Sequence, residues 1–136
     1  MSKQIDLAQK IVVLADDLTG ALDAVGPFAA RGVKVSVGTD ADQFARALET
    51  GASVVAVSTR SRDLGQGAAH RMVASVVDRL PNDVLLFKKI DSRLKGNIAA
   101  ELDAFPMAPL LVVPALPEFQ RIQKARAVSG FGVSDP

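Results

Sequence analysis

The chain has 136 residues, of which 49% are hydrophobic and 23% are charged. That length and balance predict one globular domain, which can bury a core without a disulfide or a metal. The sequence holds no Cys and a single His, His70. Thiol catalysis, disulfides, thiolate zinc sites and His-rich metal sites are therefore excluded, and His70 is expected to be a surface residue.

The formal net charge is +1, which is too balanced to predict nucleic-acid binding. The first ten residues lack the apolar core of a secretory signal. The most apolar stretch, residues 107–116, is too short to span a bilayer and contains two Pro. We therefore expect a cytoplasmic protein with no membrane partner.

Short β-branched runs alternate with longer segments of helical period, a pattern typical of βα units around a mainly parallel sheet. Five strands are predicted, at residues 11–15, 33–37, 53–58, 84–90 and 110–113. Helices are predicted at residues 21–31, 41–50, 66–80 and 97–105. The expected fold is an open, Rossmann-like, three-layer α/β domain with helices on both faces of a five-stranded sheet.

The end of the chain differs from the rest. Residues 114–136 are rich in Gly and Pro and show no clear strand or helix pattern. We predict one α/β domain over residues 1–113, followed by an irregular or truncated tail.

Three polar segments follow predicted strands, at residues 16–20, 59–63 and 88–93. In an open parallel sheet, ligands bind beyond the carboxyl ends of the strands, so these segments are candidates for a common site. The pair Asp16 and Asp17 exceeds what capping of the next helix needs, because one Asp is enough for a cap. Asp23, one helical turn later, is a weaker candidate.

The other two segments supply cations. Arg60 or Arg62 could grip a carboxylate or phosphate with two parallel hydrogen bonds, although surface Arg residues are common. The third segment places two Lys, an Asp and a Ser before a Gly-Asn helix start, although a charged strand end and a turn would also explain them.

Together the three segments offer hydrogen-bond acceptors, cations and hydroxyls. The acceptors are Asp16, Asp17 and Asp91; the cations are Arg62, Lys88 and Lys89; the hydroxyls are Ser58, Thr59 and Ser92. This combination fits a small polyhydroxylated acid, because the carboxylate of such a ligand needs a cation and its hydroxyls need acceptors.

Three ordered stretches, ADDLTGALDAVGPFAARG, VSTRSRDL and KKIDSRLKGNIAAELDA, resemble the signatures of the four-carbon acid sugar kinase family. The resemblance covers residues 11–119. It implies an amino-terminal domain that binds a sugar acid such as threonate, erythronate or a 3-oxo-tetronate. It also implies that a second domain, with no counterpart in these residues, supplies Mg²⁺ and ATP, so this chain alone is expected to bind no cofactor or metal.

The family's substrate contacts carry over to Asp16, Asp17, Arg62, Lys89, Ile90, Asp91 and Ser92. By the same resemblance, Asp17 or Asp91 is the catalytic base, and the choice between them is open. Weaker candidates around the same segments are Asp23, Ser58, Thr59, Arg60, Lys88, Arg93, Lys95 and Asn97.

The sequence departs from the family pattern at two places. Arg93 stands where the family has Thr, and Lys95 stands where it has Arg. In the tail, Gln120, Arg121 and Gln123 replace the expected Gly-Arg and following Thr.

Three alternative interpretations fit parts of the sequence. A receiver-like signalling domain also has an acidic pair after its first strand, but it needs an Asp where Ser58 and Thr59 stand. A truncated sugar-acid-binding module without catalysis is the second; it could self-associate into a homo-oligomer or pair with a nucleotide-binding domain on another chain. A dehalogenase-type hydrolase requires a carboxylate at the position of Leu18 and is set aside.

Overall fold

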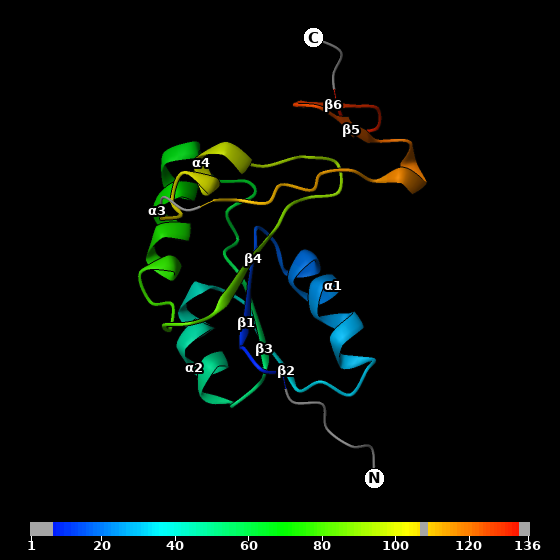
Figure 1. Cartoon of the computed structure of the whole chain (residues 1–136). Helices are drawn as coiled ribbons and strands as arrows, with labels where there is room; N and C mark the ends of the chain where they lie inside the picture. Colours follow the sequence, from blue (N-terminus) through cyan, green and yellow to red (C-terminus); the bar gives the residue numbers. More distant parts are fainter. Residues whose placement is uncertain (1–6, 107–108, 134–136) are drawn as a thin grey trace.

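A four-stranded parallel sheet in the order β2-β3-β1-β4 forms the centre of the computed structural model, which describes residues 7–106 and 109–133 (Figure 1). Its strands are β1 (Ile11–Ala15), β2 (Val35–Gly38), β3 (Val54–Ser58) and β4 (Leu85–Lys89). The central strands β1 and β3 are almost entirely buried, as expected for parallel strands that are covered on both faces.

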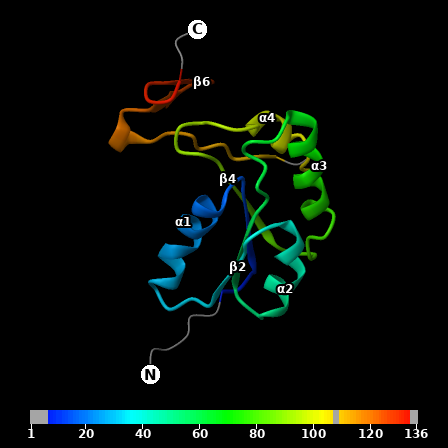
Figure 2. The same ribbon diagram turned by 180° about the vertical axis from the view of Figure 1, so that it is seen from behind.

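Helices cover the sheet on both sides. Helix α1 (Leu18–Ala29) lies on one face, and α2 (Phe44–Glu49) and α3 (Gln66–Val77) lie on the other (Figures 1 and 2). A 3₁₀ turn, η1 (Ala41–Gln43), precedes α2, and the short α4 (Ile98–Leu102) packs beside α3. This is the predicted α/β class with helices on both faces.

Two apolar cores result from the alternation of side chains along β1. Val12 and Leu14 point to the face where Phe44 of α2 and Val73 of α3 are buried. Val13 packs in the other core, with residues of α1. Because successive side chains of a strand point to opposite faces, one continuous apolar run fills both cores.

The predicted fifth strand is wrong, since residues 110–113 form no strand and their side chains are exposed. A parallel fifth strand would require the chain to return to the amino end of β4. In Figure 1 residues 110–113 instead lie near the carboxyl ends of the parallel strands. They pair with no strand of the sheet, so β4 is left as an edge strand.

The tail contains regular structure that its composition did not predict. A 3₁₀ turn, η2 (Pro117–Phe119), leads into an antiparallel hairpin of β5 (Ile122–Lys124) and β6 (Ala127–Ser129). Figure 1 shows this hairpin beyond the carboxyl ends of the parallel strands. The division of the chain at residue 113 stays a prediction.

Other boundaries move by a few residues. The helix predicted at 21–31 begins three residues earlier, and that predicted at 97–105 is shortened at both ends. His70 lies half-buried on α3. Expectations for residues 1–6 fall outside the described residues. Within the described part of the chain, no helix is long and apolar enough to cross a membrane.

Candidate functional site

The three polar segments meet because the strands that precede them are neighbours in the sheet. Ala15, the last residue of β1, is in register with Ser58 at the end of β3 and with Lys89 at the end of β4. The loops that leave these strands therefore begin side by side, as the sequence predicted.

Arg62 lies at the centre of these loops. Its Nε and Nη2 donate to the two oxygens of Asp16 at 3.0 and 3.1 Å, so the pair is bidentate. Its Nη1 lies 2.7 Å from Asp17 Oδ2, and its Nη2 lies 3.3 Å from Asp91 Oδ1. The hydrogen bond to Asp16 is the largest cause that raises the pKa of Arg62, and the charges of all three carboxylates add to it. One guanidinium thus joins the ends of β1, β3 and β4.

The two adjacent Asp residues have different surroundings. Asp16 is 3% exposed and faces Arg62. Asp17 is the N-cap of α1, and its Oδ1 accepts a hydrogen bond from the Gly20 N–H at 2.7 Å. Its other oxygen contacts Arg62. Asp17 therefore caps the helix with one carboxylate oxygen and presents the other at the site. One residue thus has both of the roles that the sequence analysis considered for the Asp pair.

Asp91 is held by backbone donors of its own loop. Its Oδ2 accepts hydrogen bonds from the N–H groups of Arg93 at 3.0 Å and Lys95 at 3.1 Å. Desolvation would raise the pKa of Asp91, but these two bonds together with the charges of Arg62 and Lys95 outweigh it, so the pKa lies below 3.8. Asp91 is therefore ionised at neutral pH.

Gly96 allows this loop to approach the buried carboxylate. Its φ is +91°, and a Cβ at this position would lie 3.0 Å from Asp16 Oδ2. A side chain here would be strained and would also press on the Asp16–Arg62 pair.

An open pocket of about 300 Å³ lies over this cluster. It is lined by Asp17, Thr19, Gly20, Asp23, Arg62, Lys89, Asp91 and Ser92. All eight come from the end of β4, the start of α1 and the two loops that follow β3 and β4. Within the pocket lining, Lys89 is a cation with no carboxylate in salt-bridge range among the described residues, and its Nζ donates to the Ile90 carbonyl at 2.6 Å.

Several sequence candidates lie outside the pocket lining. Arg60 donates to the Thr39 carbonyl, and the Asn97 amide donates to carbonyls of Ser61 and Leu64. Other candidates that do not line the pocket are Asp16, Ser58, Thr59, Lys88, Ile90, Arg93 and Lys95.

Lys88 lies on the other face of the sheet from Lys89. There it belongs to a buried network of polar side chains beneath the site. Its Nζ lies 2.6 Å from Glu101 Oε2, and both side chains are buried. Ser61 Oγ donates to Glu101 Oε1 at 2.5 Å and is 2.7 Å from Thr59 Oγ1, which donates to the Ala15 carbonyl. These contacts join β1, the start of the loop after β3, β4 and α4.

Sequence reasoning did not single out Glu101 or the hydroxyl of Ser61. The sequence feature that could have revealed Glu101 is the pair Lys88 and Lys89 on one strand. Neighbouring side chains on a strand point to opposite faces, so one Lys of a buried pair points into the protein and needs a carboxylate there.

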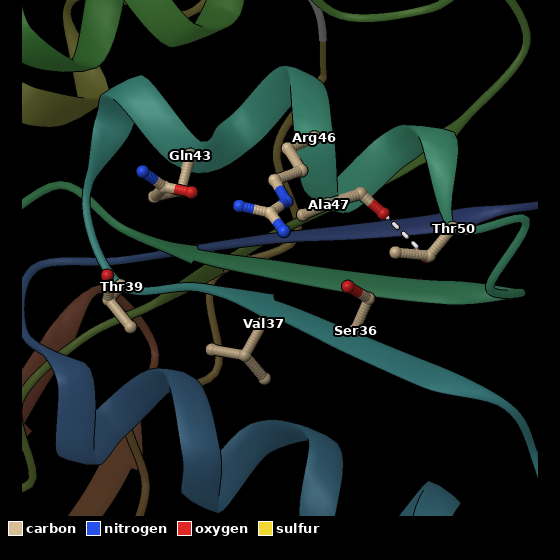
Figure 3. A pocket seen from close by; sticks show the side chains of 7 residues that line it. All are labelled: Ser36, Val37, Thr39, Gln43, Arg46, Ala47 and Thr50. Atoms are coloured by element: carbon tan, nitrogen blue, oxygen red, sulfur yellow. Dashed lines mark hydrogen bonds between the residues drawn. The ribbon is translucent and has the colours of Figure 1, made fainter.

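A second hollow of about 180 Å³ lies along the edge strand β2. Figure 3 shows Gln43 and Arg46 reaching from the η1–α2 segment toward β2, with Thr50 Oγ1 bonded to the Ala47 carbonyl at 2.7 Å. Gln43, Arg46 and Thr50 are all exposed. Without a buried charged or polar group to orient a ligand, this hollow is a weaker candidate than the pocket around Arg62.

The chain matches a known family. Residues 11–128 match the family described as the sugar-binding N-terminal domain, which is most of the chain and includes every residue of the pocket lining. The chain belongs to this family.

Relatives of the sugar-binding N-terminal domain include kinases of four-carbon acids. The chain is 37% identical over 116 residues to a D-threonate kinase of Bordetella bronchiseptica, covering 79% of this chain and 29% of that protein. It is 38% identical over 122 residues to a D-erythronate kinase of Heliobacterium modesticaldum, covering 82% of this chain and 27% of that protein. The chain thus spans less than a third of the length of these relatives.

A solved structure shares the fold of this sugar-binding domain. A domain of unknown function from Bordetella bronchiseptica, crystallised as a domain-swapped dimer with bound citrate, superposes with a TM-score of 0.77 at 32% identity. The match covers 90% of this chain and 34% of that one. A second crystal form of the same protein gives a TM-score of 0.76 at 34% identity.

The lowered pKa of Asp91 predicts an acid-sensitive part of the stability. Because the folded state holds this carboxylate below 3.8, its contribution is present above that pH and is lost as pH falls through the folded pKa. Urea unfolding from about pH 5 down to about pH 3 should show a shallower fall for Asp91→Asn than for the parent. The exposed Asp78→Asn controls for removing one carboxylate, and equal slopes for parent and Asp91→Asn would contradict the prediction.

Proposed function

We propose that this chain is the substrate-binding half of an ATP-dependent kinase that phosphorylates a four-carbon sugar acid. The observation that carries the proposal is the pocket itself. It combines the carboxylates Asp17 and Asp91 with Lys89, a cation that has no carboxylate in salt-bridge range among the described residues. The family and the named kinases support the same class of ligand.

In the proposed complex, the substrate carboxylate binds Lys89 and the hydroxyls bind Asp17, Asp91 and Ser92. Arg62 already makes contacts with three carboxylates, so its main part is to hold those acceptors in place. The cluster of three Asp, Arg62 and Lys89 carries a formal charge of −1. An excess of acceptors suits a ligand with several hydroxyl donors, and the N-terminus of α1 adds positive potential near Thr19.

The proposed reaction transfers the γ-phosphoryl group of ATP to one substrate hydroxyl. The hydroxyl oxygen attacks phosphorus, the bond to ADP breaks, and the hydroxyl proton passes to a carboxylate of this domain. Asp17 and Asp91 both line the pocket and both face Arg62, so either could accept it.

ATP and Mg²⁺ are proposed for the complete enzyme. The part of the named kinases that this chain matches covers only 29% and 27% of their length. We accordingly propose that the nucleotide and its metal bind a further domain or chain. We also propose that the protein is located in the cytoplasm.

Titration calorimetry of the purified chain tests acid binding. D-threonate or D-erythronate should bind, and Lys89→Met and Asp17→Asn should each weaken binding about tenfold or more, because each removes a charged hydrogen-bond partner. Lys10→Met, at the opposite end of the sheet, should bind like the parent. Folding of each variant is checked by circular dichroism.

The ligands provide a second set of controls. Butanoate has the carboxylate without hydroxyls, and erythritol has hydroxyls without the carboxylate, so both should bind more weakly than the sugar acid. ATP should not bind the chain alone. Equal binding of butanoate and sugar acid, or no acid binding by folded parent protein, would contradict the proposal.

We also propose that the chain self-associates through the free edge of β4. Leu85 and Phe87 on this strand are about half exposed, at 55% and 50%, and the apolar residues 110–113 are exposed as well. The structural relative is a domain-swapped dimer.

Sedimentation velocity should therefore show a dimer that Phe87→Lys converts to a monomer, because a Lys on an edge strand opposes pairing. Leu22→Lys, at a similarly exposed position on α1, is the matched control. A parent protein that stays monomeric at high concentration would contradict self-association.

A further inference from the structure

The hairpin at the end of the described chain is tied to the loop that carries Asp91 and Ser92. Arg121 is only 3% exposed. Its guanidinium donates to three backbone carbonyls, those of Ser92 at 2.6 Å, Pro114 at 2.7 Å and Phe131 at 3.1 Å. One side chain therefore connects the pocket loop, the segment before η2 and the end of the hairpin.

This burial of a charge is unusual. Within the described residues, Arg121 has no carboxylate in salt-bridge range. Removing a cation from water without a counter-charge is costly, and carbonyl hydrogen bonds offset only part of that cost. The planar fork of Arg does, however, fix several acceptors in one geometry, which Lys cannot do.

A second set of contacts joins the same two segments. Gly132, with φ +80°, lies against the backbone of Arg93, and a Cβ there would come within 2.9 Å of the Arg93 carbonyl oxygen. The guanidinium of Arg93 lies over the Phe131 ring, 5.7 Å from its centroid. Phe131 in turn stacks on Phe119 at 5.1 Å. These contacts do not involve Arg121, so two independent features hold the hairpin to the loop.

The contacted loop is part of the pocket. Ser92 and Asp91 line it, and the Asp91 carboxylate depends on the loop backbone, because it accepts hydrogen bonds from Arg93 and Lys95. A change in the path of residues 92–95 would move these donors and with them the carboxylate. The hairpin segment thus contacts the loop, and the loop backbone in turn contacts the Asp91 carboxylate in the pocket wall.

We propose that residues 116–133 are a positioning element of the acid-binding pocket, in which Arg121 acts through the Ser92 carbonyl to hold Asp91 and Ser92 in place. This proposal rests on the proposed function of the pocket for its effect on affinity. Its structural part, the ordering of the loop, does not.

The experiment uses Arg121→Ala and Gly132→Ala, which break the two sets of contacts separately, in the full chain. Amide hydrogen exchange followed by NMR should show faster exchange at the three loop amides bonded to Asp91, those of Arg93, Leu94 and Lys95. Amides of β1 and β3 should keep their protection, which separates a local effect from global unfolding. Arg126→Ala, at an exposed position in the same hairpin, should leave the loop amides unchanged.

Affinity is measured on the same variants with D-threonate and D-erythronate. Both loop-contact variants should weaken acid binding about fivefold to tenfold, and Arg121→Lys should not restore it, because an ammonium cannot bond three carbonyls in the same plane. Millimolar guanidinium chloride should partly restore binding to Arg121→Ala.

The two proposals fail in different ways. If the parent binds no acid but the variants still speed exchange at the loop amides, the positioning role stands and the proposed function is wrong. If the parent binds acid, and both Arg121→Ala and Gly132→Ala keep parental affinity and loop protection, the positioning role is wrong. If Arg121→Ala unfolds, Gly132→Ala decides the matter by the same readouts.

Discussion

The contact of one guanidinium with three carboxylates organises the carboxyl end of this sheet. Asp16 and Asp17 directly follow β1, Arg62 lies in the loop after β3, and Asp91 lies in the loop after β4. Without Arg62, three negative charges would lie close together, with one of them almost fully buried. The guanidinium of Arg62 is thus engaged with carboxylates of the protein, whereas Lys89 is the cation that we propose binds the ligand.

The two Lys residues at the end of β4 lie on opposite faces of the sheet and have different contacts. Lys89 lies on the side of α1 and lines the pocket, whereas Lys88 is buried against Glu101 of α4. A buried ion pair of this kind adds little net stability, because desolvation offsets its attraction, but removing one partner would leave an uncompensated charge. Its effect is to fix α4 and the loop before it relative to β3 and β4.

Much of this arrangement was predictable from sequence. The β-branched runs identified the four strands, and the rule that ligands bind at the carboxyl ends of parallel strands brought Asp17, Arg62, Lys89 and Asp91 to one place. The burial of Glu101 was not predictable, because a lone Glu on an amphipathic helix usually faces solvent. The LLVV run at residues 110–113 has a strand composition, yet it forms no strand and its side chains are exposed. The hairpin was missed because its strands are three residues long and exposed, so they carry no alternating pattern.

We propose that Arg62 holds the carboxylates in place while Lys89 binds the acid. A crystal structure of the chain with D-threonate or D-erythronate tests this proposal most directly. We expect a substrate carboxylate within hydrogen-bond distance of Lys89 Nζ, hydroxyls on Asp17 and Asp91, and Arg62 still paired with Asp16. A substrate carboxylate bound to Arg62 in place of Asp16 or Asp17, with Lys89 free of contact, would contradict it.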